Sequence, residues 1–215
     1  MAVNAFRTLA QVLFLAIFVF LLVQENIQAW IMVLGLGWLG SLLLGRIYCG
    51  WACPMGTLMR AQTWLYRKVK KSRFRIPKLR ENPGSQTVIT VLRIFMLVLF
   101  LAGMMAVRAM GMEINVILYL VILAVITSFF FLEDLWHRIC PHGAVMNVTS
   151  RPSRWGMKID KDQCTGCARC EKVCPAQAVY QLEGSKIRAI NNRECLVCLE
   201  CQRTCREEAI SYGKL

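Results

Sequence analysis

Long apolar runs, separated by short polar turns, fill most of the first 135 residues of the chain. Four runs are long enough to cross the ~30 Å hydrocarbon core of a bilayer, which takes about 20 apolar residues in a helix. They cover residues 5–23, 27–44, 88–107 and 114–132. The first run lacks a small-residue cleavage site and leads directly into the second, so we expect an uncleaved helix rather than a signal peptide. The pattern therefore predicts four transmembrane helices.

The last quarter of the chain is polar, and it holds eight of the eleven cysteines in two runs of one pattern. Each run reads C-x2-C-x2-C-x3-C, a spacing typical of [4Fe–4S] ligands. In two-cluster ferredoxins the fourth cysteine of a run ligates the other cluster, so the two ligand sets are predicted to cross over. The first set is Cys164, Cys167, Cys170 and Cys205, and the second set is Cys195, Cys198, Cys201 and Cys174.

The residues around these cysteines repeat as well. Ile159 and Ile190 each stand five positions before the first cysteine of a run. The segment resembles the bacterial dicluster ferredoxin over roughly residues 157–213, and we expect a short strand and a helix in each half. Arg206 stands where that family has a proline. Disulfides suit a secreted domain, and nothing places this segment outside the cell. Structural zinc uses CxxC pairs, with neither this third cysteine nor the x3 step.

The basic residues are distributed unevenly along the chain. The net charge is +13, from 26 basic and 13 acidic residues, and ten Lys and Arg lie between Arg46 and Arg80. The turns between the paired apolar runs carry only Arg108. The positive-inside rule therefore places the long basic loop in the cytoplasm, together with both termini and the cysteine-rich segment. This charge indicates anionic lipid headgroups or an acidic soluble electron carrier as partners, and no nucleic acid is expected.

The remaining three cysteines lie at two related points. Cys49 and Cys53 follow the second apolar run, and Cys140 follows the fourth. Both points read C-P-x-G, which indicates that the membrane part is also duplicated. With the stretch from Gly45 to Pro54, this arrangement resembles the membrane polyferredoxins of the NapH/NosR type. The resemblance implies a prokaryotic inner-membrane protein, with a cytoplasmic ferredoxin domain that exchanges electrons with a quinone pool or a partner redox subunit.

A third metal site is predicted at the inner membrane face. On a helix, the spacing of Cys49 and Cys53 puts both sulfurs on one face. The second motif has Trp136 where a cysteine is expected, and the only two histidines of the chain flank Cys140. Thiolates with an imidazole suit an iron–sulfur centre or a structural zinc, and buried unliganded cysteines are the alternative. The predicted ligands are Cys49, Cys53, Cys140 and His137, with His142 as the alternative histidine.

Other positions carry weaker signals. Arg93 lies inside the third apolar run, where an arginine either extends to the headgroups or contacts a quinone or a cluster. Met104, Met105, Met110 and Met112 suit packing or Cu(I) ligation. Glu25 and Glu113, in the outer turns, are candidate acceptors of a quinol proton. The sequence has no dinucleotide fingerprint, nucleophile motif or haem attachment site.

The sequence thus predicts a membrane all-α domain of four transmembrane helices over residues 1–150. A small α+β dicluster ferredoxin-like domain follows over residues 151–215. The expected function is that of an electron-transfer subunit of a multi-subunit oxidoreductase, rather than an enzyme acting alone. The alternatives are an electron donor for maturation of a copper or haem enzyme, and a membrane anchor whose clusters serve as a redox sensor.

Overall fold

The computed structural model describes residues 2–24, 26, 29–68, 83–111, 122, 126 and 133–215. Internal contacts group the chain into two units, each described by itself below. The first unit comprises Met1–Pro54 and Met146–Leu215, and the second comprises Met55–Val145. The predicted domain boundary at residue 150 stays a prediction.

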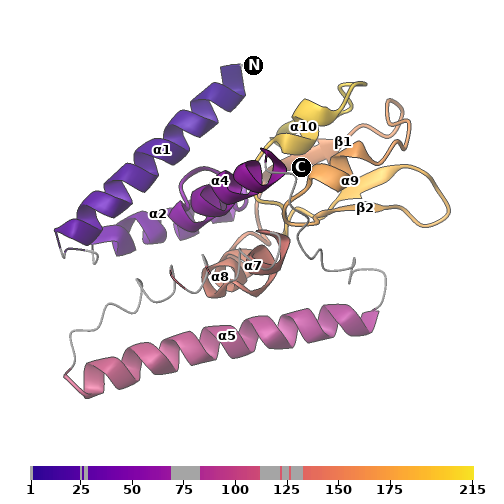
Figure 1. The fold of residues 1–215 in the computed structure, drawn as a ribbon. Coiled ribbons are helices and arrows are strands. Elements are labelled where there is room, and N and C mark those ends of the chain that lie inside the picture. Colours follow the sequence, from indigo (N-terminus) through magenta and orange to yellow (C-terminus); the bar gives the residue numbers. More distant parts are fainter. Residues whose placement is uncertain are drawn as a thin grey trace. The chain divides into compact units, whose positions relative to one another are not determined.

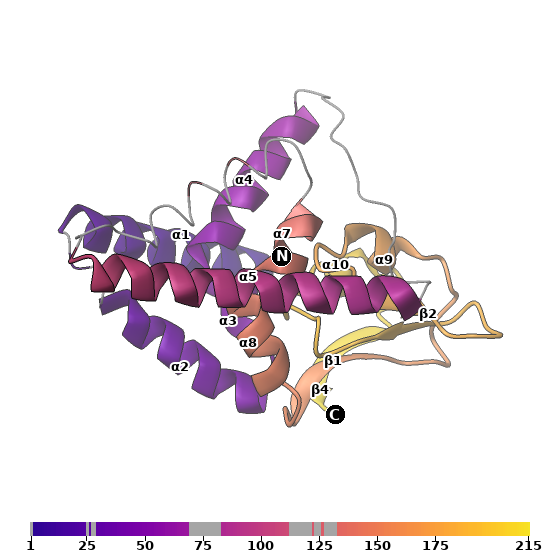
Figure 2. The same ribbon diagram turned by 90° about the horizontal axis from the view of Figure 1, so that it is seen from below.

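The helices of the first unit pack on the cysteine-rich segment. They are α1 (Ala2–Val23) and α2 (Ala29–Leu44), labelled in Figure 1, and the short α3 (Ile47–Trp51), labelled in Figure 2. α2 ends at Gly45, whose φ of +72° is the left-handed conformation that commonly terminates helices. The carbonyls of Leu43 and Leu44 accept hydrogen bonds from Arg154 N–H at 3.2 Å and from the Tyr212 hydroxyl at 3.0 Å. These bonds satisfy groups that a helix C-terminus leaves free, and they join α2 to the strands that follow.

The second unit is helical in its described residues. It contains most of α4 (Pro54–Lys68), α5 (Pro83–Ala109) and α7 (Glu133–Ile139), and α8 (Pro141–Thr149) begins in it (Figure 2). Pro54 and Pro141 are the first residues of their helices, a position where the missing N–H is tolerated. A residue that precedes proline is disfavoured in helical conformation. Cys53 and Cys140 therefore lie at breaks between helices, and Cys53 does not share one continuous helix with Cys49 as the sequence spacing suggested.

Among the described residues, two helices are long and apolar enough to cross a membrane, by length and composition. They are Ala5–Val23 and Val88–Ala109, with mean hydropathies of 2.3 and 2.5. α2 is apolar but has 16 residues, which at 1.5 Å per residue gives about 24 Å, less than the ~30 Å core. The predicted span at residues 114–132 falls almost wholly outside the described residues. Of the four predicted spans, only the first and third coincide with a described helix of sufficient length and apolarity, so four transmembrane helices are not shown.

The cysteine-rich segment is a small α+β structure, described in full. β1 (Trp155–Ile159) pairs antiparallel with β4 (Ile210–Lys214), and β2 (Val179–Gln181) pairs antiparallel with β3 (Arg188–Ile190). Two one-turn helices, α9 (Arg169–Val173) and α10 (Glu200–Thr204), lie between them in the sequence. Each half therefore contributes two strands, not the single strand expected, and each sheet joins one strand from each half. The pair formed by β1 and β4 is labelled in Figure 2.

The backbone of this segment repeats at the same offset as its cysteines. Ala168 and Leu199, which precede α9 and α10, both have φ of 60°. Gln177 and Glu208, three positions after the fourth cysteine of each run, have φ of 49° and 48°. Left-handed conformations are uncommon for residues other than glycine, so their recurrence at matched positions shows that both halves fold in the same way. The predicted duplication is confirmed.

Candidate iron–sulfur sites

The first cavity of the cysteine-rich segment is lined by cysteines from both runs. Three come from the loop before α9 and from its first turn, and the fourth follows α10. The four are Cys164, Cys167, Cys170 and Cys205. Arg169, Arg188 and Glu207 also line this cavity, and Arg188 Nε is 2.9 Å from a carboxylate oxygen of Glu171. The structure thus brings together the four cysteines that the crossed assignment puts in one set.

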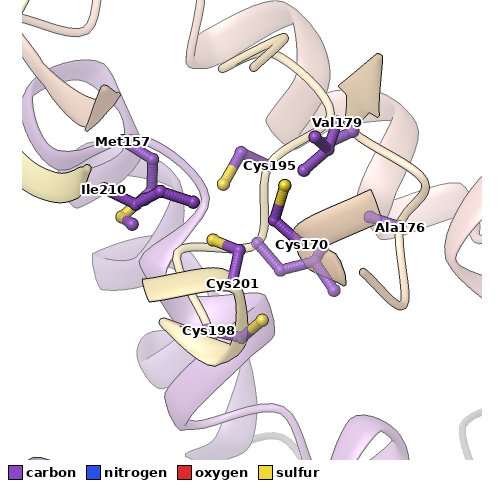
Figure 3. Packing of buried hydrophobic residues seen from close by; sticks show 10 residues of the cluster. Met157, Cys170, Ala176, Val179, Cys195, Cys198, Cys201 and Ile210 are labelled. Carbon is purple, nitrogen blue, oxygen red and sulfur yellow. The ribbon is translucent and has the colours of Figure 1, made fainter. Parts of the chain in front are cut away.

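The second cavity repeats this arrangement in the other half. Its cysteines are Cys174, Cys195, Cys198 and Cys201, again with the fourth coming from the other run. The rest of its lining is apolar or backbone, and all of the lining residues are described and uncharged. Figure 3 shows Cys195, Cys198 and Cys201 gathered with Met157 and Ile210 in the core cluster of the segment.

The donor chemistry of both cavities fits a [4Fe–4S] cluster, which exchanges single electrons when bound. Each cavity offers four sulfurs, and backbone N–H groups point at some of them. Ala178 N–H lies 3.2 Å from Cys174 Sγ, and Val197 N–H lies 3.4 Å from Cys195 Sγ. Such donors stabilise thiolates and influence the potential of a cluster. The first cluster would be held by the cysteines of the first cavity, and the second cluster by those of the second cavity.

The protonation of the cysteines also favours a metal cofactor. Burial raises the pKa of the Cys195 and Cys201 thiols well above the ordinary value. A thiolate at either place is therefore costly unless a cation neutralises it, as cluster iron does. Among the described residues, no three His, Cys, Asp or Glu side chains close around a single metal ion. A cubane is much larger than one ion, so its four ligands must stand further apart than ligands of zinc.

The two cavities differ in their exposure to solvent. Cys167 of the first cavity is exposed, and the backbone N–H of Arg169 lowers the pKa of its thiol. Cys195, Cys198 and Cys201 of the second cavity are buried, with 8%, 7% and 7% of their surfaces exposed. The first cavity therefore has one cysteine at the surface of the unit, whereas three of the four cysteines of the second cavity are buried.

Helix α3 covers the loop of the second cavity, residues 194–200. Trp51 Nε1 donates to the Val197 carbonyl at 2.9 Å, and Gln11 of α1 donates to the Gly50 carbonyl at 2.7 Å. A Cβ on Gly50 would lie 2.3 Å from the Leu196 carbonyl oxygen, so only glycine permits this approach. Cys49 packs against the core cluster that contains the buried cysteines of the second cavity. The C-x3-C-P motif therefore adjoins the second cavity.

Two buried arginines from the helical part reach the same loop. Arg7 of α1 donates to the Cys198 carbonyl and to the Glu200 carboxylate. Arg46, which is 1% exposed, lies 3.4 Å from a carboxylate oxygen of Glu194. Burial opposes ionisation of Glu200, but the hydrogen bonds and charges of Arg7 and, to a smaller extent, Arg203 outweigh this effect and lower the pKa of Glu200. Each arginine therefore forms a partly buried ion pair at one end of the loop.

The predicted third site has its residues in two units. Cys49 Sγ lies 3.3 Å from Met146 Sδ, and Cys53 N–H donates to the Tyr48 carbonyl at 3.0 Å, all within the first unit. Cys140 and His137 belong to the second unit, where Cys140 N–H donates to the Trp136 carbonyl at 2.9 Å. The third site thus stays a prediction.

The other weaker signals resolve in part within the second unit. The His142 ring packs edge-on against Phe100, with 5.5 Å between centroids, and burial lowers the pKa of His142. Arg93 is buried and donates to the Arg138 carbonyl near the end of α7. It therefore holds two helices together instead of extending to the headgroups, and its predicted contact with a quinone or cluster stays a prediction. Met112, Glu25 and Glu113 lie outside the described residues.

Sequence reasoning missed Arg7, Gln11 and Arg46, which join the helices to the ferredoxin-like part. A signal for Arg7 was available, because a charged residue near the start of an otherwise apolar helix calls for a buried or polar partner. Its partner could not be found from the sequence, since Arg7 and Cys198 lie at opposite ends of the chain.

Comparisons with known proteins agree with this chemistry. The 4Fe-4S binding domain family matches residues 26–73 and 115–159, and the 4Fe-4S dicluster domain family matches residues 156–206. The two stretches of the first match contain the two C-P-x-G points. No solved structure matches the chain.

Three proteins are similar to this chain in sequence. The ferredoxin-type protein NapH of Haemophilus influenzae is 28% identical over 74% of this chain and 57% of its own length. A candidate electron transport protein of Escherichia coli, YccM, is 24% identical over 64% of this chain and 43% of its own length. The uncharacterized protein MJ0749 of Methanocaldococcus jannaschii is 28% identical over 64% of this chain and 54% of its own length. The chain spans about half the length of these relatives.

The chain is therefore an iron–sulfur protein with 4Fe–4S ferredoxin-type domains. The matched domains and the similarity to NapH and YccM support the polyferredoxin family that the sequence resembles. This confirms the NapH part of the expected resemblance, and the NosR part stays a prediction.

Proposed function

We propose that the chain is a membrane-bound iron–sulfur subunit that relays electrons between clusters at the cytoplasmic face and a membrane quinone or a partner redox subunit. The observation that carries this proposal is the docking of the second cavity's loop directly under α1 and α3. A soluble electron carrier needs no such attachment. The quinone, the partner and the cytoplasmic orientation belong to the proposal.

The described apolar helices support a membrane setting. Only 17% and 6% of the apolar stretches of these two helices are buried inside the protein, far less than in the core helix of a soluble domain. The start of α1, at Arg7, and the end of α2, at Leu44, both contact the ferredoxin-like part. If α1 and α2 cross the bilayer, this part lies at the membrane surface on the side of the chain's start, as the charge distribution predicted.

The order of the relay follows from the difference in exposure. The exposed thiol of Cys167 places the first cavity where a soluble or peripheral partner has access. The second cavity adjoins Cys49 and α3, and hence the membrane side of the first unit. We infer that electrons pass between an outside partner and the first cavity, then the second cavity, then the C-x3-C-P motif.

The experiment uses the full chain in nanodiscs of bacterial lipid with a menaquinol or ubiquinol analogue. If the proposal is right, the visible absorbance of the iron–sulfur clusters decreases when quinol is added, because the clusters become reduced. The chain should also resist extraction from native membranes by carbonate. The variant Cys49→Ser/Cys53→Ser/Cys140→Ser should keep its ferredoxin clusters and lose most of the quinol response. A variant of an exposed residue outside the path, Arg203→Gln, serves as the control.

Two results would count against the relay. One is a triple variant that responds to quinol as fast as the native chain, which would remove the motif from the path. The other is release of the chain by carbonate with its clusters intact, which would remove the membrane role. Oxidation of dithionite-reduced clusters by a co-purified subunit, without response to quinol, would select the partner over the quinone.

A further inference from the structure

The two cavities obtain their positive charge from different parts of the chain. The first cavity is lined by Arg169 and Arg188, both from the ferredoxin-like segment itself. The residue that matches Arg188 in the other half is Met157, two positions before Ile159, and it is buried and apolar. The second cavity has no charged residue in its lining, all of which is described.

The positively charged side chains near the second cavity come instead from α1 and from the connection between α2 and α3. Arg7 of α1 contacts the carbonyl of Cys198, one of the cysteines of this cavity, and its side chain is 5% exposed. Arg46, between α2 and α3, reaches the other end of the loop at Glu194 and is also buried. Neither residue belongs to the stretch matched by the dicluster family.

We propose that Arg7, together with Arg46, raises the reduction potential of the cluster in the second cavity. The contact of α1 with the loop of this cavity would then determine how readily the cluster accepts an electron. This inference deepens the proposed function. It rests on the proposed function in one respect, namely that both cavities hold clusters. Arg7 acts through charge and a backbone contact, so it is a positioning and tuning residue and not a ligand.

The physical reason is the charge balance of reduction. One electron adds one negative charge to the cluster, and net charge is one of the main determinants of its potential. A buried cation stabilises that added charge more than an exposed one, because solvent screens it less. Arg7 also neutralises Glu200, so removing Arg7 leaves a carboxylate next to Cys201 with its main buried partner gone.

The chain offers a matched control in Arg203. This residue binds the same carboxylate, with Arg203 Nη2 at 2.9 Å from Glu200 Oε2, but its side chain is 60% exposed. The variants Arg7→Gln and Arg203→Gln therefore remove the same charge from the same partner at different depths. Glu200→Gln makes the opposite change, since it leaves Arg7 uncompensated.

The experiment is a dithionite titration of the detergent-solubilised full chain, followed by electron paramagnetic resonance. Cys167→Ser alters an exposed ligand of the first cavity, and the redox wave that it moves is thereby assigned. Arg7→Gln should lower the reduction potential of the other wave by about 59 mV, which is a tenfold change in the equilibrium constant for a one-electron reduction. Glu200→Gln should raise that same wave, and Arg203→Gln should move it less than about twofold.

The inference is overturned if Arg7→Gln leaves the second wave within about twofold of native, or shifts both waves equally. If Arg7→Gln does not fold, Arg46→Gln and Glu200→Gln provide the test. Arg46→Gln should lower the reduction potential of the second wave and Glu200→Gln should raise it, and shifts that are equal or absent would overturn the inference. The titration contains no quinone and no partner, so its outcome is independent of the relay. A chain without any redox wave would instead refute the proposed function.

Discussion

The close approach of α3 to the loop of the second cavity leads to a sharp prediction for Gly50→Ala. The added Cβ would lie 2.3 Å from the Leu196 carbonyl oxygen and 3.3 Å from the Cys198 backbone nitrogen and Cα. Both partners are backbone, so no flexible side chain can give way. Either α3 or the loop must move, and we expect the cost to be about 1–3 kcal/mol, the usual range for overpacking a close contact.

Displacement of α3 also strains the hydrogen bonds beside Gly50. The Trp51–Val197 bond of 2.9 Å and the Gln11–Gly50 bond of 2.7 Å both bridge this contact. Each contributes about 0.5–1.5 kcal/mol, so losing one of them raises the total cost to about 1.5–4.5 kcal/mol. Since 1.4 kcal/mol is a factor of ten, the loop should open at least about five times more often from the clash alone, and up to about 1,600 times more often if a hydrogen bond is also lost.

The assay is amide hydrogen exchange of the peptide covering residues 194–200, in the cluster-loaded chain. Gly40→Ala is the matched control, because a Cβ on Gly40 meets nothing within 4 Å and lies in the same apolar part of the chain. Alanine in mid-helix is favourable by about 0.5–1 kcal/mol relative to glycine, so this control should not loosen the loop. Equal exchange of the loop in both variants would refute the reasoning.

Three further predictions follow from the sites. Cys174→Ser should impair the second cluster and Cys205→Ser the first, each with loss of up to about four irons per chain; loss of the cluster of the variant's own run would contradict the crossed sets. Trp51→Phe should keep the ring packing but lose the bond to Val197, raising exchange of the loop by up to about tenfold; unchanged exchange would show that the bond is not formed in solution. In the cluster-free chain, the folded-state pKa of Cys195 is raised above the ordinary 9.0. Stability should therefore fall as pH rises above about 9, when only the unfolded thiol ionises, with a smaller fall in Cys195→Ala; identical pH slopes would contradict this.

The sequence predicted the ferredoxin-like part well because cluster ligation constrains spacing strongly. The C-x2-C-x2-C-x3-C runs and the isoleucines before them were enough to predict the duplicated fold, and the structure groups the cysteines in the predicted sets. The second strand of each half was missed, since three-residue strands such as β2 and β3 carry too few positions to show a period.

The helical part was predicted less completely, for physical reasons that concern single residues. The i, i+4 spacing of Cys49 and Cys53 suggested one helix, but Pro54 restricts the residue before it and breaks the helix there. Arg93 was expected to extend to the headgroups, yet it is buried against Arg138. The roles of Arg7 and Arg46 depend on contacts between distant parts of the chain, which local patterns do not contain.

The alternatives raised by the sequence gain no specific support. Met104 and Met105 on α5, and Met110 just after its end, are exposed, with 39%, 74% and 61% of their surfaces accessible. Exposed methionines in an apolar segment suit contact with lipid or with another helix. The electron-relay reading therefore remains the one that the docked loop favours.

Iron and acid-labile sulfide, measured on the purified full chain together with its redox activity, test the central claim most directly. Two clusters require about eight irons and about eight sulfides per chain, and a third iron–sulfur centre would raise the iron count to about ten to twelve. The account predicts at least the first value, with two one-electron waves. A chain that holds zinc or disulfides in place of iron, or that shows no redox wave with its iron bound, would contradict it.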